Sequence, residues 1–495
     1  MRIVRRGDAD YDQARAISNA RFDLSPWAIY YCENADDVAV AIGDARKNGV
    51  GVRIRSGGHQ HEGMCSADGV LLIDLSAIHS FEFLEEKLGR VWIGAGAALG
   101  DVYVELWRRG YYFAGGACGD VHVGGLTQGG GWGFGARKLG LTCDSLVGVE
   151  IVTANGEVLE IPRPGHPEDR ALLEALRGAG GGNFGVITKF CFRLHPWKQG
   201  YTDLSLTWGD DQLPGDTLDK LLVHWMKTFP RDEDRNLTTF MRLLVAPSGS
   251  SDRLLLSGRY LGDVYEAQAA VKRLLRGRWA PRVTTYTASP PRDPRRKGPL
   301  RLAASAREEL RKQMGTHPGY QPGPASAPAA AGQSPDLTST CAGIPLRHKV
   351  SSGFVRRRLS PKLVPALTGV VRRTRPIPPE LARQYVSLHC LGGAVSDGRL
   401  PAAYAFRDRN VLLQYQAWWQ PDAVSLDKPC IRWIERFRQA MAPYTDGAFI
   451  NFVDRDIPLE EYYKDKLPRL EEVKRQWDPK NFFSFEMGIP PSAVR

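Results

Sequence analysis

The stretch that decides the fold of this chain covers residues 115–135 and reads GGACGDVHVGGLTQGGGWGFG. It places one cysteine, Cys118, among more glycines than a regular helix or strand carries. Glycine lets the backbone approach a ligand closely and adopt positive φ, and consecutive free N–H groups form a concave anion site. We therefore predict that this stretch is a ligand-binding loop.

Two further glycine-rich turns lie near this loop in the sequence. Residues 56–63 read SGGHQHEG and follow the strand-like residues 51–55, with His59 at the tip of the turn; residues 178–185 read GAGGGNFG. None of the three reads as GxxxxGK(S/T), or as GxGxxG between a strand and a helix, which argues against a P-loop and a Rossmann site. If these loops bind a dinucleotide, they form a binding site of another type.

Taken in order, the SGGH turn, the GxC loop with its GG and GGGxG, Asp144 and VTANG at residues 152–156 resemble a known FAD-binding domain. That domain is the PCMH-type domain of the vanillyl-alcohol oxidase and p-cresol methylhydroxylase superfamily. The chain is most similar to the berberine bridge enzyme-like oxidases, whose closing signature matches DPKNFF at residues 478–483. The resemblance is strongest over residues 21–196 and 451–490.

The resemblance implies FAD held by two covalent bonds, from His59 to the flavin 8α-methyl and from Cys118 to C6. Read alone, His59 would be a satisfied turn histidine and Cys118 a small buried side chain. His61 is the rival of His59 and lies two residues further along the turn. The cysteines that compete with Cys118 lack glycines on both sides; they are Cys65, Cys143, Cys191 and Cys390.

By the same resemblance, further residues contact FAD. Those expected around the diphosphate and the ring edge are Arg55, Ser56, Gly57, Gly58, Gln60, Gly124, Gly125, Gly130 and Gly133, with Gly185 and Val186 on the adenosine side and Asn451 and Asn481 from the tail. Val121, three places after Cys118, stands where relatives gate oxygen, and its short branched side chain leaves room for O2. Asp144 matches a family position, but a turn cap is an equally good interpretation.

Length predicts two domains, because 495 residues exceed the size at which one hydrophobic core stops growing. We place a PCMH-type FAD-binding domain at residues 1–200 and a substrate domain, an antiparallel sheet backed by helices, at residues 201–445. Residues 446–495 form a C-terminal segment that returns to the FAD domain. The expected fold class is α+β.

Charge and cysteine content exclude several other classes. The net charge of +11 comes from scattered basic residues, so a nucleic-acid partner is not expected. No apolar run reaches ~18 residues and the N-terminus lacks a signal-peptide core, which favours a cytoplasmic protein without a membrane partner. Eight cysteines without a CxxC pair support neither a disulfide framework nor a metal site. Oligomeric state is open.

Several elements can be placed from local patterns. A helix is expected after Asn34 and before Gly49, and another over residues 459–477. The other predicted elements are strands at 70–75, 91–96, 146–153, 158–161, 184–194, 202–208, 238–245, 254–261, 385–391 and 411–419, and helices at 99–109 and 171–177. The tract at residues 315–335 is rich in proline, alanine and glycine, and we interpret it as a loose insertion or lid, with disorder the simpler alternative.

The usual catalytic tyrosine of the family is absent, because the motif next to Asn451 carries Phe452. The central loop likewise has Trp132 where tyrosine is usual, so the predicted pocket is more apolar and aromatic. The proposed base is His389, which alternation places on one strand face with Tyr385 and Ser387.

A structural histidine at the edge of the sheet is the alternative for His389. The weaker candidates for the base are Tyr404, Tyr415 and Tyr444.

These observations predict an FAD-dependent oxidase. It would transfer a hydride from an alcohol or amine carbon of a small molecule to bicovalently bound FAD, with O2 as acceptor and H2O2 as product, in bacterial secondary metabolism. The alternatives are a carbohydrate or oligosaccharide oxidase, a flavin dehydrogenase with another electron acceptor, and a degenerate member whose flavin is structural.

Overall fold

The computed structural model describes residues 1–84, 89–289, 345–398 and 400–493. In this part of the chain, the first sheet has the order β1-β2-β4-β3. Its strands are β1 (Arg2–Arg5), β2 (Ala28–Tyr31), β3 (Val52–Arg55) and β4 (Leu71–Asp74). β4 runs parallel to β2 and β3, whereas β1 is antiparallel to β2. The β3 strand leads directly into the turn that carries His59.

Helix α2 (Ala35–Asn48) confirms the predicted capping signals. The Asn34 side chain accepts a hydrogen bond from the Asp37 N–H at 2.9 Å, which satisfies one of the unpaired amides at the start of the helix. Gly49 ends the helix with φ of 65°, a left-handed conformation that glycine adopts without a Cβ penalty.

A second sheet follows, with the order β5-β6-β10-β8-β9 among the described residues. Its strands are β5 (Phe81–Phe83), β6 (Arg90–Gly94), β8 (Leu146–Val152), β9 (Val158–Ile161) and β10 (Val186–Arg193), all antiparallel to their neighbours. The helices of this region are α1 (Tyr11–Arg15), α3 (Leu99–Trp107) and α6 (Pro167–Leu176), and β7 (Tyr111–Tyr112) pairs with β11 (His195–Pro196). The elements predicted here are confirmed, with boundaries shifted by up to four residues.

The central glycine stretch contains a helix, contrary to the prediction that its glycines exclude one. Helix α4 (Val123–Gln128) runs through the middle of the stretch, and α5 (Ala136–Leu139) follows it. A Cβ added at Gly124 would lie 3.0 Å from the Ala95 carbonyl oxygen. The glycines therefore let a short helix pack directly against backbone, in addition to forming the loop around it.

The larger sheet has the order β15-β12-β14-β13-β17-β18-β16-β19 in the described ranges, and every pairing is antiparallel. Its strands are β12 (Tyr201–Trp208), β13 (Leu237–Leu244), β14 (Leu254–Tyr260), β15 (Val283–Ser289), β16 (Arg347–Val355), β17 (Ala382–Cys390), β18 (Val411–Trp419) and β19 (Thr445–Asp446). The five strands predicted from alternation are confirmed; β15, β16 and β19 were not anticipated.

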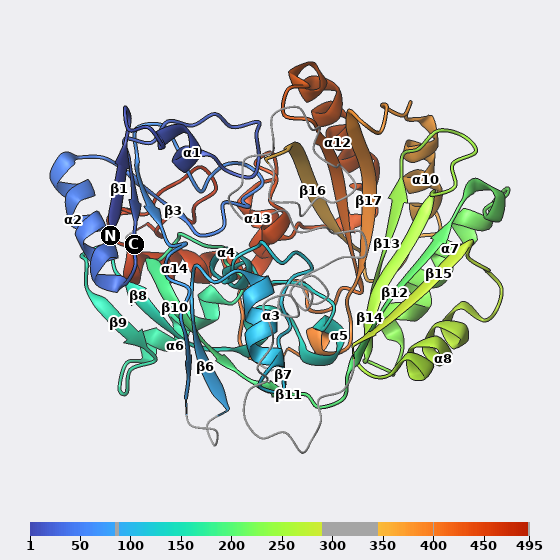
Figure 1. Cartoon of the computed structure of the whole chain (residues 1–495), viewed down its shortest axis with the longest axis horizontal. Helices are drawn as coiled ribbons and strands as arrows, with labels where there is room; N and C mark the ends of the chain where they lie inside the picture. Colours follow the sequence, from blue (N-terminus) through green and yellow to red (C-terminus); the bar gives the residue numbers. More distant parts are fainter. Residues whose placement is uncertain (85–88, 290–344, 399, 494–495) are drawn as a thin grey trace.

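Helices cover one face of this sheet, and the glycine loops face the other (Figure 1). The covering helices are α7 (Thr217–Thr228), α8 (Val264–Leu275), α10 (Leu363–Arg373) and α12 (Asp427–Met441). On β17, Val386, Leu388 and Cys390 pack into the cluster shared with these helices. Ser387 and His389 therefore lie on the opposite face, as the alternation predicts.

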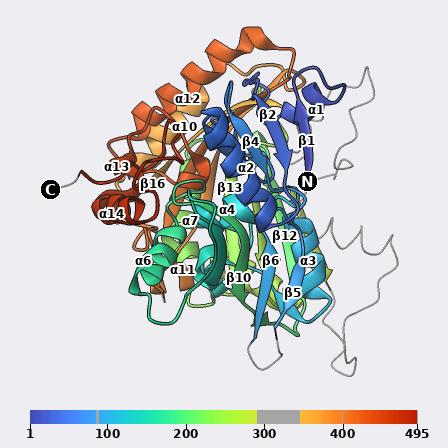
Figure 2. The same cartoon turned by 90° about the vertical axis from the view of Figure 1, so that its left-hand side faces the viewer.

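The C-terminal segment packs against the first two sheets, and Figure 2 shows α14 beside α6. The single helix predicted over residues 459–477 is wrong. The segment forms α13 (Leu459–Tyr463) and α14 (Leu467–Trp477), separated at Lys464, whose φ is 50°. Pro468 lacks the N–H that a continuous helix would need, and its ring would clash with the carbonyl of Lys464.

The predicted lid at residues 315–335 lies outside the described residues. Within them, no helix has both the length and the apolar composition that crossing a bilayer requires.

Candidate functional site

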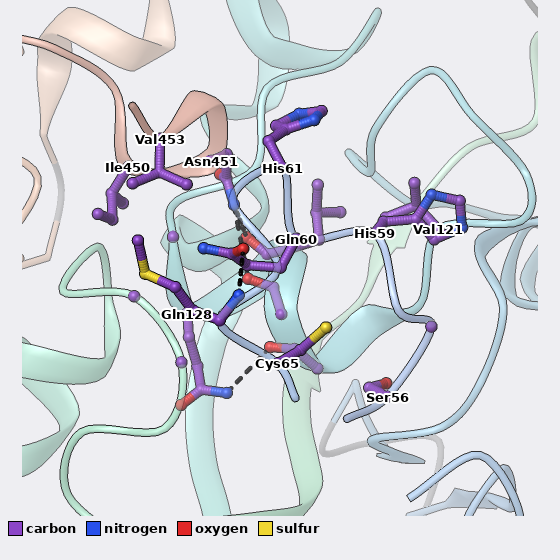
Figure 3. Close-up of a pocket in the computed structure, with 18 of the residues that line it drawn as sticks. Ser56, His59, Gln60, His61, Cys65, Val121, Gln128, Ile450, Asn451 and Val453 are labelled. Carbon is purple, nitrogen blue, oxygen red and sulfur yellow. Dashed lines mark hydrogen bonds between the residues drawn. The ribbon is translucent and has the colours of Figure 1, made fainter. Parts of the chain in front are cut away.

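A cavity of about 360 Å³ lies between the three glycine-rich loops and the open face of the large sheet. Part of its lining is drawn in Figure 3. Its volume falls in the range of small-molecule and cofactor sites. Residues from β13, β17, β18 and the C-terminal segment complete the wall. The cavity thus brings together segments from all parts of the described chain.

The two expected attachment residues, His59 and Cys118, both line this cavity. His59 Nε2 lies 3.5 Å from Asp120 Oδ2, so the turn carrying the histidine contacts the loop carrying the cysteine. A Cβ at Gly57 would lie 2.9 Å from the ring of His122, which explains the need for glycine there. Figure 3 shows Val121 beside His59.

Cys118 is disulfide-bonded in the structure, although the cysteine pattern of the sequence supports no disulfide framework. One sulfur cannot hold a disulfide and a flavin thioether together, so attachment through Cys118 requires this disulfide to be reduced. The free cysteines among the described residues are Cys32, Cys65, Cys143, Cys191, Cys390 and Cys430. Burial raises the pKa of the Cys65 thiol to about 11, which keeps this cavity-lining rival protonated.

Most of the residues expected to contact FAD line the cavity. These are Ser56, Gly57, Gly58, His59, Gln60, Cys118, Val121, Gly124, Gly125, Gly185 and Asn451. The lining does not include Arg55, Gly130, Gly133, Asp144, Val186 or Asn481.

The charged residues outside the lining have structural partners. Arg55 Nε donates to Asp74 Oδ2 at 2.5 Å, which joins β3 to β4. The Asp144 carboxylate accepts from the Leu141 N–H at 2.8 Å and from the Arg407 guanidinium. The turn-cap interpretation of Asp144 is therefore the one that the geometry supports.

The other four residues that do not line the cavity have roles in the local backbone structure. Val186 is fully buried in the pairing of β10 with β8, and Asn481 takes a left-handed turn with φ of 50°. A Cβ at Gly133 would lie 1.6 Å from the Gly115 carbonyl oxygen, and Gly130 has φ of 116°. These glycines permit close backbone packing just behind the cavity wall.

Asn451 holds the central glycine loop from the C-terminal side. Its Oδ1 accepts from the Gly131 N–H at 2.9 Å, and its Nδ2 donates to the Leu126 carbonyl at 3.3 Å. A Cβ at Gly129 would lie 2.1 Å from Nδ2, so glycine is required at that position. Asn451 therefore fixes the shape of the loop as well as lining the cavity.

The proposed base, His389, is buried in the cavity wall among aromatic side chains. Its ring centroid lies 4.4 Å from that of Trp132, 5.5 Å from Phe452 and 5.7 Å from Phe240. Its Nε2 lies 2.9 Å from Gln414 Oε1, so Nε2 carries the hydrogen and donates it. The buried Nδ1 has no hydrogen-bond partner and keeps its lone pair.

Burial lowers the pKa of His389 to about 4, although the Gln414 hydrogen bond opposes this shift. The cause is desolvation, which penalises the imidazolium form. At neutral pH the ring is neutral, with Nδ1 able to accept a proton.

The tyrosine rivals lie away from the cavity. Tyr404 packs between Phe354, Phe406 and Phe449, and Tyr415 stacks on Phe437 on the helix-covered side of the sheet. Burial raises the pKa of both phenols above the ordinary value. Tyr444 is only partly buried at the edge of that same cluster.

His61 forms a pair with His348 rather than serving as a free ligand. His348 Nδ1 lies 3.2 Å from the Leu346 carbonyl oxygen, so it carries the hydrogen and leaves Nε2 as an acceptor. His61 Nδ1 then donates to His348 Nε2 at 3.0 Å. Burial lowers the pKa of His61 to about 3 and that of His348 well below its ordinary value, so both rings are neutral.

Sequence reasoning missed several polar lining residues. Gln414 and Gln416 of β18, Arg242 of β13 and Gln128 of α4 all line the cavity. The available signal was the spacing of Gln414, Gln416 and Trp418 at every second position, which places them on one face of the predicted strand.

Two family models match the chain. Residues 26–162 match the model of the FAD binding domain, and residues 448–490 match the model of berberine and berberine like proteins. The FAD-linked oxidoreductase YgaK of Bacillus subtilis is 30% identical over 499 residues, covering 99% of this chain and 97% of that protein. The chitooligosaccharide oxidase of Gibberella zeae is 27% identical, with 98% and 92% covered.

Solved structures share the fold over the whole chain. The BBE-like 1 protein of Physcomitrella patens superposes with a TM-score of 0.81 at 25% identity, covering 100% of this chain and 97% of that one. The glucooligosaccharide oxidase of Acremonium strictum superposes with a TM-score of 0.79 at 19% identity, with 100% and 98% covered. That oxidase is described as carrying a 6-S-cysteinyl, 8α-N1-histidyl FAD.

Proposed function

The chain belongs to the berberine bridge enzyme-like family of FAD-linked oxidoreductases, and on this premise we propose that it is an oxidase of a small-molecule alcohol or amine. Residues of the cavity, His59 and Cys118 among them, would hold FAD, which would supply the acceptor for the substrate hydride and the route of the electron pair to O2, with H2O2 as product. The observation that carries the proposal is the shared cavity, which holds His59 and Cys118 on one side and His389 on the other.

The residues present fit a flavin dinucleotide. Glycines from all three loops line the cavity, among them Gly58, Gly124 and Gly181, and expose backbone to it. A Cβ at Gly124 would lie 3.0 Å from the Ala95 carbonyl oxygen, and one at Gly181 would lie 3.3 Å from the Gln128 side-chain amide, so both positions favour glycine. We assign His59 and Cys118 as the covalent attachment sites of the flavin. If His59 is attached through Nδ1, Asp120 would hold the ring through Nε2.

We assign His389 Nδ1 as the base that accepts the proton of the substrate hydroxyl. A carbinol carbon loses hydride readily only when its O–H proton leaves as well, so a base must face the alcohol. Gln414 fixes the tautomer that leaves Nδ1 unprotonated. Trp132, Phe240 and Phe452 exclude water around the ring and hold its orientation.

Oxidation of a carbohydrate is the second candidate function. It is favoured by the similarity to the chitooligosaccharide oxidase over nearly the full length of both chains. Against it stands the aromatic character of the wall, since Trp132 and Phe452 carry no hydroxyl group for a sugar.

Anaerobic mixing with alcohols, amines and oligosaccharides tests the proposal. We expect one class of compound to bleach the visible absorbance of the flavin, and air to restore the absorbance with release of peroxide. Colour that returns only with an artificial electron acceptor would instead identify a dehydrogenase. A flavin that no compound bleaches would contradict the proposal.

A further inference from the structure

Arg242 is a cation in the cavity wall without an acidic partner in the described part of the chain. It projects from β13, lines the cavity, and its buried Nε has no hydrogen-bond partner. Its guanidinium carbon lies 4.4 Å from the ring centroid of Tyr385 and 5.6 Å from that of Phe240. Two aromatic rings thus hold this cation without neutralising its charge.

The other buried arginines of the described chain are satisfied in one of two ways. Arg137 and Arg177 donate to backbone carbonyl oxygens, whereas Arg55 and Arg259 pair with carboxylates. Arg55 Nε lies 2.5 Å from Asp74 Oδ2, and Arg259 Nε lies 2.7 Å from Asp203 Oδ1. Desolvation lowers the pKa of Arg242, as expected for a charge removed from water without a counterion. Because an unpaired buried charge is costly, the missing anion is expected from a ligand.

The neighbours of Arg242 across the sheet are also hydrogen-bond donors. The register places Arg242 beside Ser387 of β17, and Ser387 beside Gln414 of β18. Ser387 Oγ accepts from Gln416 Nε2 at 3.3 Å, which leaves its hydroxyl hydrogen to donate. Gln414 Oε1 accepts from His389, which leaves the Gln414 amide hydrogens to donate. All three residues line the cavity.

We propose that Arg242, Ser387 and Gln414 bind a carboxylate of the substrate, so that the substrate is a small aromatic or apolar acid with an oxidisable alcohol or amine carbon. The planar guanidinium matches a carboxylate with two parallel hydrogen bonds. A sugar hydroxyl both donates and accepts hydrogen bonds, whereas Arg242, Ser387 and Gln414 offer hydrogen-bond donors. The walls made by Trp132 and Phe452 suit an apolar body rather than a sugar ring.

This inference rests on the proposed oxidase function and adds a consequence for His389. Arg242 contributes to the low pKa of His389 through its positive charge. A bound carboxylate would offset that charge and so favour proton transfer to His389 Nδ1. Substrate binding and base strength are therefore coupled through Arg242.

In the test, the oxidised holoenzyme is titrated with benzoate, phenylacetate and cinnamate, and in parallel with the uncharged amide of each acid. Binding is followed by the change in flavin absorbance. The variants are Arg242→Gln, Arg242→Lys and, as a matched control, Arg383→Gln on β17, whose side chain does not line the cavity. Flavin content and amide affinity report whether each variant is folded.

We expect at least one carboxylate to bind roughly tenfold or more tightly than its amide to the wild type. Arg242→Gln should abolish this preference and leave amide affinity unchanged, Arg242→Lys should keep part of it, and Arg383→Gln should keep all of it. Equal binding of all three acids and their amides, or a preference that survives in Arg242→Gln, would overturn the inference. Because binding is read without turnover, failure of the oxidase proposal would show separately, as a flavin that no substrate bleaches.

Discussion

Lys349 of β16 and Asp454 of the C-terminal segment form a buried ion pair, with 2.6 Å between Nζ and Oδ1. Lys349 Nζ also lies 2.7 Å from Glu62 Oε1, in the turn that carries His59. One ammonium group therefore joins the large sheet, the first glycine turn and the C-terminal segment. It holds together the three parts of the chain whose residues share the cavity.

Replacing Lys349 with methionine should destabilise the protein by about 3–5 kcal/mol, because Asp454 would remain buried with only Arg438 nearby, at 3.9 Å, and Glu62 would keep only Arg21 and Arg455. Chemical denaturation measures the change in the free energy of unfolding. The control is Lys220→Met on α7, whose partner Asp216 is exposed at the N-cap of that helix. A Lys349→Met loss no larger than that of the control would show that the buried pair is dispensable.

Acid should destabilise the protein through the pair of His61 and His348. Their folded-state pKa values are lowered by burial, so below about pH 6.5 the unfolded state binds more protons than the folded state. The free energy of unfolding therefore keeps its full value above about pH 6.5. As the pH falls toward the folded-state pKa values, each histidine lowers this free energy by about 1.4 kcal/mol per pH unit.

His348→Gln should flatten this slope between pH 6 and pH 4.5, as measured by denaturation at several pH values. An unchanged slope in His348→Gln would contradict the buried neutral pair.

His389→Gln should lower the rate of anaerobic flavin reduction by about 10²-fold while flavin remains bound, because the amide cannot accept the proton. Tyr404→Phe is the matched control, since Tyr404 lies outside the cavity, and it should change the rate little. With a pKa of about 4 for His389, wild-type reduction by a neutral alcohol should show no protonation step near pH 6.5. A His389→Gln rate within a few-fold of wild type would exclude this base.

Val121 should control the reaction of the reduced protein with oxygen. It lines the cavity beside His59, and a larger side chain there would fill the space next to the flavin. Val121→Leu should slow reoxidation in stopped-flow mixing with air-saturated buffer by roughly tenfold or more, because a filled cavity excludes a small solute. Slow reoxidation of the wild type that Val121→Gly does not accelerate would count against an oxygen gate at this position.

Local signals in the sequence identified much of the fold and of the cofactor loops. Asn34 marks the start of α2 through its side-chain cap, Gly49 marks the end through its left-handed backbone, and residues 411–419 form β18 as predicted. His59 and Cys118 were recognisable because each stands in a short glycine motif. Such features depend on a few neighbouring residues, so they are visible without tertiary structure.

Features that depend on distant partners could not be predicted. Asp144 binds Arg407, which is 263 residues away in the sequence, and nothing local distinguishes this role from a cofactor contact. The low pKa of His389 arises from burial by Trp132 and other residues on separate elements. Arg242 reads as one polar residue in a strand until the sheet register places it among donors.

The most direct test of the account is mass spectrometry of a digest of the acid-denatured holoenzyme. We predict one conjugate in which FAD joins the peptide containing His59 to the peptide containing Cys118, and yellow colour that stays with the denatured protein. His59→Ala and Cys118→Ala should each leave flavin on the other peptide, and the double variant should release it. Complete extraction of FAD from the denatured protein, with Cys118 recovered in a disulfide, would contradict the account.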